Sequence, residues 1–261
     1  MKEAGAMRFK DKVFIVTGGG TGIGRATAIR LASEGASVVI ANRSEANARE
    51  TLEQITGMAG KAIFVQTDVG QHDDIVRLVQ AAVDTYGQLN GIVHSAAVES
   101  LHGVVDLPVE EWHRTINVNL TSAFLLGKYG IPLMIQAGGG AIVNVASVHA
   151  QATINQYAAY AASKGGLMAL TRSMAIDYAK QGIRVNAVLP GATFTGMLNR
   201  FAELGGVMNA NLHEAWKDEQ PLGRIGEPGE IANLICFLAS DEATFMIGSG
   251  VVIDGGMLAQ L

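Results

Sequence analysis

Tyr160 and Lys164 are the residues whose types and spacing first suggest chemistry. They stand four positions apart in an alanine-rich stretch, 157–164, that should be helical, so their side chains share one helix face. A phenol beside an ammonium can donate and accept a proton, and the positive charge favours the phenolate and lowers a pKa of about 10. A Tyr and a Lys on a helix surface usually only pack and solvate, however. The pair is therefore informative only if the chain brings other reactive groups to it.

The elements that would position this pair follow from the hydrophobic pattern. Apolar runs bounded by glycines predict seven strands, at 12–17, 38–41, 62–65, 91–94, 141–145, 183–188 and 250–253. Helices should lie between them: one from Gly22, a polar one from Ser44, and one with apolar residues at 3.6-residue spacing over 75–86. The helix that carries Tyr160 should stop at Gly182.

This strict alternation predicts an α/β protein with a doubly wound, parallel, seven-stranded sheet and helices on both faces, which is the Rossmann topology. No interior linker or repeat marks a boundary, so we expect residues 1–261 to form a single domain. The composition agrees, with 49% hydrophobic residues, only 16% charged residues and 32 glycines.

The composition does not favour a nucleic-acid-binding, membrane, disulfide-bonded or metal-binding protein. The net charge is −5 without a Lys/Arg cluster, which gives nucleic-acid or anionic-membrane binding little support. The single cysteine, Cys236, excludes an internal disulfide and a cysteine metal site, and the six histidines show no ligand spacing. Residues 1–12 hold no apolar signal core and no apolar run approaches membrane-spanning length, so we expect a cytoplasmic protein and no metal.

A glycine-rich turn lies between the first strand and the first helix. It reads Thr17-Gly18-Gly19-Gly20-Thr21-Gly22-Ile23-Gly24. Glycines let the backbone approach a phosphate, and a helix N-terminus offers free N–H groups and a partial positive charge. The alternative is an ordinary glycine-rich turn. Since strand, turn and helix follow in the required order, the stretch favours a dinucleotide-binding site.

The spacing Gly18-x-x-x-Gly22-x-Gly24, together with Tyr160-x-x-x-Lys164, resembles the classical short-chain dehydrogenases/reductases. Further motifs extend the resemblance over nearly the whole chain, namely Asp68-Val69, Asn119 in Val-Asn-Leu-Thr, Ser147, and Pro190-Gly191. The resemblance implies hydride transfer between a nicotinamide cofactor and a ketone or secondary alcohol. It also implies cofactor contacts at Gly18, Thr21, Gly22, Ile23, Gly24, Asn42, Arg43, Asp68, Val69, Ala96, Tyr160, Lys164, Pro190, Gly191 and Thr195.

The end of the second strand bears on the choice of cofactor. An acidic residue there would accept from a ribose 2′-hydroxyl and repel a 2′-phosphate. This chain has neutral Asn42 followed by Arg43, whose planar fork can hold a phosphate, so we expect NADP(H) over NAD(H). NAD(H) remains possible, because Arg43 could be a solvated loop residue and Asn42 could bind a 2′-hydroxyl. Thr21 stands where some NADP-preferring relatives have a basic residue.

Asn119, Ser147, Tyr160 and Lys164 match the family's catalytic residues. The resemblance implies that Tyr160 is the general acid or base, Lys164 lowers its pKa and holds ribose hydroxyls, Ser147 donates to the substrate oxygen, and Asn119 holds a water. Tyr157 has an alanine four residues on and so lacks a lysine partner, and Asn117 lacks the following Leu-Thr. The family's usual Asn-Asn-Ala-Gly is His94-Ser95-Ala96-Ala97 here, and we expect altered strand ties or stability without loss of function.

Residues 193–226 should form a largely apolar substrate lid. Phe194, Met197, Leu198, Phe201 and Leu204 fall on one helical stripe, and Met208, Leu212 and Trp216 on another, although both could simply pack on the core. His149 could line the same pocket or the surface. The apolar ending 255–261 and the family's habit of tetramers lead us to expect a homotetramer, a dimer of dimers.

The leading hypothesis is an NADP(H)-dependent enzyme acting on a small carbonyl or alcohol. Two other readings stay open: a catalytically silent NADP(H)-binding protein, and another reaction on the same fold, such as enoyl-type C=C reduction or a lyase step.

Overall fold

The computed structural model describes residues 7–204 and 219–260. Its centre is a seven-stranded sheet in which every neighbouring pair of strands is parallel. The spatial order is β3 (Lys61–Gln66), β2 (Ser37–Asn42), β1 (Val13–Thr17), β4 (Gly91–His94), β5 (Gly140–Val145), β6 (Ile183–Pro190) and β7 (Gly250–Ile253). The seven predicted strands and the doubly wound Rossmann topology are confirmed, with strand ends that differ by one or two residues.

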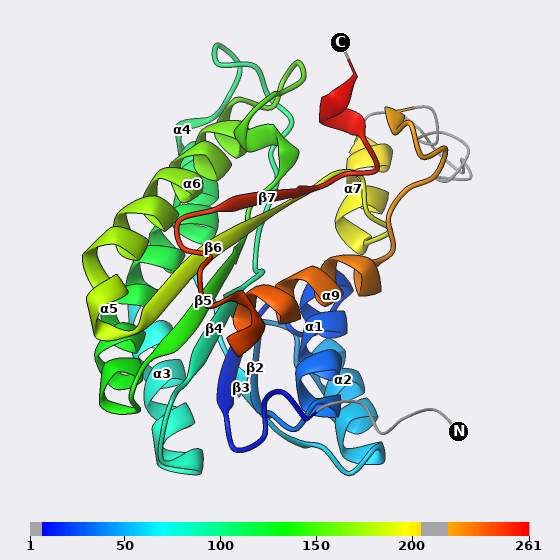
Figure 1. The fold of residues 1–261 in the computed structure, drawn as a ribbon. Coiled ribbons are helices and arrows are strands. Elements are labelled where there is room, and N and C mark those ends of the chain that lie inside the picture. The colour runs from blue at the N-terminus through cyan, green and yellow to red at the C-terminus, as the bar shows by residue number, and fades with distance from the viewer. Residues whose placement is uncertain (1–6, 205–218, 261) are drawn as a thin grey trace.

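Helices cover both faces of the sheet (Figure 1). On one face lie α1 (Gly22–Ser33), α2 (Glu45–Gly57) and α9 (Pro228–Ala239); on the other lie α3 (His72–Tyr86), α5 (Ser122–Gln136) and α6 (Ala158–Tyr178), with α4 (Val109–Ile116) packed on α6. Each face has its own buried cluster of aliphatic side chains. The helix that carries Tyr160 ends at Tyr178, and a short 3₁₀ turn leads to Gly182, whose φ of 78° ends the segment as expected.

One helical stretch, Val109–Gln136, is long and apolar enough to cross a membrane by length and composition, a test that core helices of soluble proteins also pass. The stretch is not a continuous apolar run, because polar and charged residues such as Asn119 and Lys128 interrupt it. The stretch joins α4 to α5 through a π-helical turn at Asn117–Thr121. In the structure α5 packs against α3, β4 and β5, and its buried residues are part of the sheet's core.

The side chain of His94 does not tie neighbouring strands together. Its ring is buried, and Nε2 lies 2.7 Å from Ser122 Oγ on α5. The Ser122 hydroxyl donates its own proton to the Val118 carbonyl at 2.6 Å, so Nε2 must be the donor to Ser122. The tie between strand ends comes instead from Thr17 Oγ1, which accepts from the main-chain N–H groups of Ser95 and Ala96 at 3.1 and 3.2 Å.

The predicted lid region is described only in part. A helix, α7 (Gly196–Leu204), carries Met197, Leu198 and Phe201, while Phe194 precedes the helix and therefore does not belong to its stripe. The second stripe, Met208, Leu212 and Trp216, lies outside the described residues.

Candidate functional site

The glycine turn after β1 has the geometry that a phosphate needs. Gly18 and Gly22 have φ angles of 66° and 51°, in the left-handed region that favours glycine. A Cβ on Gly24 would lie 2.2 Å from the Gly18 carbonyl oxygen, so only glycine lets the turn close on the helix. Thr21 precedes α1 and makes no capping hydrogen bond with its side chain. The first N–H groups of α1 are therefore available to an anion.

The ends of β2 and β3 form the next part of the same cleft. Asn42 donates from Nδ2 to the Ser44 carbonyl at 2.8 Å, and Asp68 Oδ1 accepts from the Gly70 N–H at 2.9 Å. Arg43 is exposed, and its guanidinium has no hydrogen-bond or ion-pair partner within the described part of the chain. A cation and two polar side chains thus lie where the carboxyl ends of these strands meet.

Ser147, Tyr160 and Lys164 meet beyond the end of β5. Ser147 follows the strand in extended conformation and accepts the His149 N–H at 3.2 Å. Tyr160 and Lys164 lie on the first turns of α6 with 7% and 2% of their surface exposed. Lys164 Nζ donates to the Val145 carbonyl at 2.7 Å and lies 5.5 Å from the centre of the Tyr160 ring. The predicted pair therefore shares one helix face and points toward Ser147.

Burial dominates the ionisation of both members of the pair. It lowers the pKa of Lys164 from its ordinary value to about 7. It raises the pKa of Tyr160, an effect that the neighbouring Ser147 side chain opposes and the Glu99 carboxyl reinforces. The expected lowering of the Tyr160 pKa by Lys164 is therefore not what this structure shows. Burial disfavours the charged phenolate, and the lysine beside it is itself desolvated, with a lowered pKa.

Asn119 has a structural position. It is fully buried in the π-helical turn, and its Oδ1 accepts the Val98 N–H at 2.8 Å. Its Nδ2 donates to the Val98 carbonyl at 2.8 Å and to Ser163 Oγ at 3.0 Å. Both amide protons are thus used, and the side chain does not line the cavity that the other three residues share. Asn119 clamps the loop after β4 to α6.

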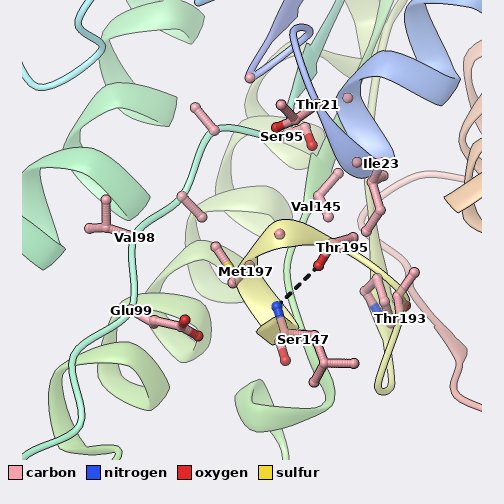
Figure 2. Close-up of a pocket in the computed structure, with 18 of the residues that line it drawn as sticks. Thr21, Ile23, Ser95, Val98, Glu99, Val145, Ser147, Thr193, Thr195 and Met197 are labelled. Carbon is pink, nitrogen blue, oxygen red and sulfur yellow. Dashed lines mark hydrogen bonds between the residues drawn. The ribbon is translucent and has the colours of Figure 1, made fainter. Parts of the chain in front are cut away.

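These groups line one cavity of about 810 Å³ at the carboxyl edge of the sheet. Figure 2 shows the glycine turn with Thr21 and Ile23 at one end, and Glu99, Met197 and Ser147 at the other. The cavity brings together Ser147 and every residue for which a cofactor contact was predicted: Gly18, Thr21, Gly22, Ile23, Gly24, Asn42, Arg43, Asp68, Val69, Ala96, Tyr160, Lys164, Pro190, Gly191 and Thr195.

A dinucleotide fits these residues. The glycine cradle would be filled by a Cβ at Gly24, and the cavity runs from the neutral and basic pair Asn42–Arg43 to the acid–base pair of α6. Its volume falls in the range of pockets that enclose small ligands, roughly 300–1,000 Å³. In the part of the chain that the structure describes, no cluster of three His, Cys, Asp or Glu side chains could hold a metal.

Glu99 and Tyr157 are among the cavity residues that sequence reasoning missed. Tyr157 was set aside because it lacks a lysine partner, yet its hydroxyl donates to Glu99 Oε2 at 3.0 Å. Its ring lies 4.6 Å from that of Tyr160 and contacts His149 and Phe201 edge-on, at 4.7 and 5.6 Å between ring centres. Burial raises the pKa of Glu99 to about 7. The sequence signal that could have indicated Glu99 is a carboxylate five residues after the end of β4, at the edge of the sheet where ligands bind.

The described part of 193–226 lies over this end of the cavity. Thr193, Thr195, Gly196, Met197, Leu198, Arg200, Phe201 and Glu219 all line it. Thr195 Oγ1 accepts the Leu198 N–H at 3.3 Å, an interaction that positions the start of α7 (Figure 2). His149 lines the cavity and is not a surface residue, and burial lowers its pKa.

Comparison with known proteins gives consistent matches. The model of a family described as enoyl-(acyl carrier protein) reductase matches residues 18–258. A cyclohexanol dehydrogenase of Acinetobacter sp. (strain SE19) is 36% identical over 256 residues, which are 98% of this chain and 98% of that protein. A cis-4-hydroxycyclohexanecarboxylate dehydrogenase of Sinomonas cyclohexanicum is 38% identical over 252 residues, 96% of this chain and 98% of that one.

Solved structures agree in fold. The crystal structure of levodione reductase superposes with a TM-score of 0.93 and 32% identity, covering 97% of this chain and 100% of the other. The ligand-free aldohexose dehydrogenase of Thermoplasma acidophilum gives a TM-score of 0.90 at 33% identity, covering 98% of each chain.

Proposed function

Because the chain belongs to the short-chain dehydrogenase/reductase family and is an oxidoreductase acting on CH–OH and C=O groups, we propose that it interconverts a cyclic ketone and the corresponding secondary alcohol with NADP(H). The observation that carries the proposal is the convergence of Ser147, Tyr160 and Lys164 on the cavity that also contains the glycine turn.

The chain's own residues have distinct parts in this proposal. The raised pKa of Tyr160 keeps its phenol protonated at neutral pH, ready to protonate a carbonyl oxygen. Ser147, beside it, donates to the same oxygen as negative charge develops there. Lys164, whose pKa of about 7 lets it exchange a proton near neutrality, lies 5.5 Å from the centre of the Tyr160 ring and would hold the ribose hydroxyls of the bound nucleotide. When bound, the nicotinamide would supply or accept the hydride.

The relatives' names and the cavity walls support a ring substrate. Two relatives are named for alcohols of a cyclohexane ring. The residues that line the cavity include the apolar side chains of Val98, Val148, Met197, Leu198 and Phe201. Apolar walls with a few polar groups suit a small alicyclic molecule.

Arg43 supports the choice of NADP(H). It is an exposed cation at the end of β2 beside neutral Asn42, so a 2′-phosphate there would meet a guanidinium and an amide. The Asp68 carboxylate lies at the end of β3 and accepts the Gly70 N–H. We further propose that 193–226 acts as a lid within a single domain, and that the cytoplasmic protein is a homotetramer. The fully exposed Phe245 and the half-exposed Val252, near edge strand β7, are apolar surface that a second subunit could cover.

The test is a matrix of NADPH or NADH oxidation against cyclohexanone, a linear ketone and an enoyl thioester. The proposal expects turnover of cyclohexanone with NADPH at a kcat/KM at least tenfold above that with NADH. The enoyl thioester tests a second candidate, C=C reduction, which the description of the matching family favours. Turnover of the thioester alone would replace the first proposal with the second.

A further inference from the structure

Glu99 occupies the end of the cavity beyond the acid–base pair. It lies on the loop between β4 and α4, and Figure 2 shows its carboxyl directed from this loop toward the middle of the pocket, across from Ser147. The side chain is half-buried and acts electrostatically on Tyr160. It is thus a carboxyl group in the compartment where a substrate's far end would lie.

The hydrogen bonding of Glu99 is incomplete. Oε2 accepts the Tyr157 hydroxyl, whereas Oε1 is buried and has no hydrogen-bond partner among residues 7–204 and 219–260. A buried acceptor left without a donor is costly, and more so for a charged group. Oε1 is closed to solvent in this conformation, so a ligand donor would reach it after a small rotation of the carboxyl, or would bind beside Tyr157 at Oε2.

The pair can offer only acceptors while the carboxyl is ionised. Tyr157 has spent its one proton on Glu99, and a carboxylate has no proton to give. Around it stand the apolar side chains of Val98, Met197 and Phe201, which cannot donate a hydrogen bond. The nearby cation, Arg200 on α7, is exposed and lowers the pKa of Glu99 electrostatically without a described hydrogen bond to it.

We propose that Glu99, held by Tyr157, is a specificity-determining residue that binds a hydroxyl group on the side of the substrate opposite the reacting carbon and disfavours an anionic group there. The inference rests on the proposed function and deepens it. It predicts that this chain prefers a hydroxylated ring ketone to one that carries a carboxylate.

The experiment compares three ketones that differ at one ring carbon: cyclohexanone, 4-hydroxycyclohexanone and 4-oxocyclohexanecarboxylate, each with NADPH at pH 8. The wild type should show a kcat/KM for the hydroxylated ring about tenfold or more above that for cyclohexanone. Glu99→Leu should bring this ratio close to one. Glu99→Gln, which keeps the shape and loses the charge, should raise kcat/KM for the carboxylate at least fivefold relative to cyclohexanone.

Glu110→Gln is the matched control. Glu110 is exposed on α4, so the substitution changes the net charge equally without touching the cavity, and both ratios should stay as in the wild type. If Glu99→Leu fails to fold, the near-isosteric Glu99→Gln decides alone. Ratios that agree within twofold between the wild type and the Glu99 variants would overturn the inference, whatever happens to absolute turnover.

Turnover of cyclohexanone tests the proposed function separately. If none of the three ketones is reduced, the proposed function fails, and the inference is then decided by calorimetric binding of 4-hydroxycyclohexanone to the wild type and to Glu99→Gln. Weaker binding to the variant supports the subsite. Equal binding, or no binding to either protein, contradicts it.

Discussion

Lys164 Nζ donates a 2.7 Å hydrogen bond to the main-chain carbonyl of Val145, the last residue of β5. This bond anchors α6 to the carboxyl edge of the sheet at the point where Ser147 leaves it. It also compensates in part for burying the lysine, whose Nζ lies among strand ends with little access to water. Lys164 therefore positions the reactive pair through this bond, although burial disfavours its charged form.

The buried lysine gives the protein a pH-dependent stability. Its pKa is about 7 in the folded chain and regains its ordinary value of 10.5 on unfolding, so the unfolded chain binds the extra proton between these values. Stability contributed through Lys164 therefore rises with pH from 7 to 9, by at most about 1.4 kcal/mol per pH unit. Urea unfolding of the wild type and Lys164→Met at both pH values should show the wild type gaining on the variant. A gap that does not change with pH would contradict the burial effect.

Removing the Asn119 amide should lower the stability of the protein, because this side chain holds the loop after β4 against α6 and does not line the cavity. Asn119→Ala loses three buried hydrogen bonds and leaves the Val98 main-chain groups unpaired, which should lower the free energy of unfolding by about 2–4 kcal/mol. Asn117→Ala is the control, because Asn117 is exposed two residues away. Denaturant unfolding of the two variants decides the matter, and equal stabilities would show that the clamp is dispensable.

The glycine turn should tolerate no side chain at Gly24. A Cβ there would lie 2.2 Å from the Gly18 carbonyl oxygen, so Gly24→Ala must push the turn away from the start of α1. We expect NADPH affinity, followed by fluorescence titration, to fall more than tenfold. Gly229→Ala on α9, where a Cβ meets nothing within 4 Å, should bind as the wild type does. Unchanged affinity of Gly24→Ala would show that the turn does not cradle the phosphates.

Arg43 should decide between the two nucleotides. Arg43→Ala removes the exposed guanidinium at the end of β2 and should lower the ratio of NADPH to NADH kcat/KM at least tenfold, mainly through KM for NADPH. Arg49→Ala serves as the control, since Arg49 pairs with Glu45 on α2 and does not line the cavity. A ratio unaffected by loss of Arg43 would leave the nucleotide preference without its proposed cause.

The sheet, its order and most cofactor-facing residues were predictable because they depend on local patterns. Buried parallel strands give continuous apolar runs, and Gly18 and Gly24 stand where the backbone allows only glycine. What the sequence could not give are contacts between distant segments. The Glu99–Tyr157 bond joins residues 58 positions apart, and neither residue has a local pattern that foretells it.

The direction of the Tyr160 pKa shift was also predicted wrongly. The spacing of Tyr160 and Lys164 predicted a depressed phenol pKa, but the depth of burial, which is a property of the whole fold, reversed the direction. Likewise, His94 in place of the family's usual Asn led us to expect an altered contact between neighbouring strands. The hydrogen bonds that join these strand ends are accepted by Thr17 Oγ1 from Ser95 and Ala96, which directly follow β4. Because Thr17 is far from these residues in the sequence, no local pattern indicates the contact.

The most direct test of the central claim is the single-turnover reduction of cyclohexanone by Tyr160→Phe with NADPH. The variant keeps the ring and its stacking on Tyr157 and loses only the acidic proton, so we predict a rate at least about 10²-fold below the wild type, with NADPH affinity unchanged within twofold. Tyr178→Phe, at the far end of the same helix, should react as the wild type does. A rate for Tyr160→Phe within tenfold of the wild type would contradict the assignment of Tyr160 as the proton donor.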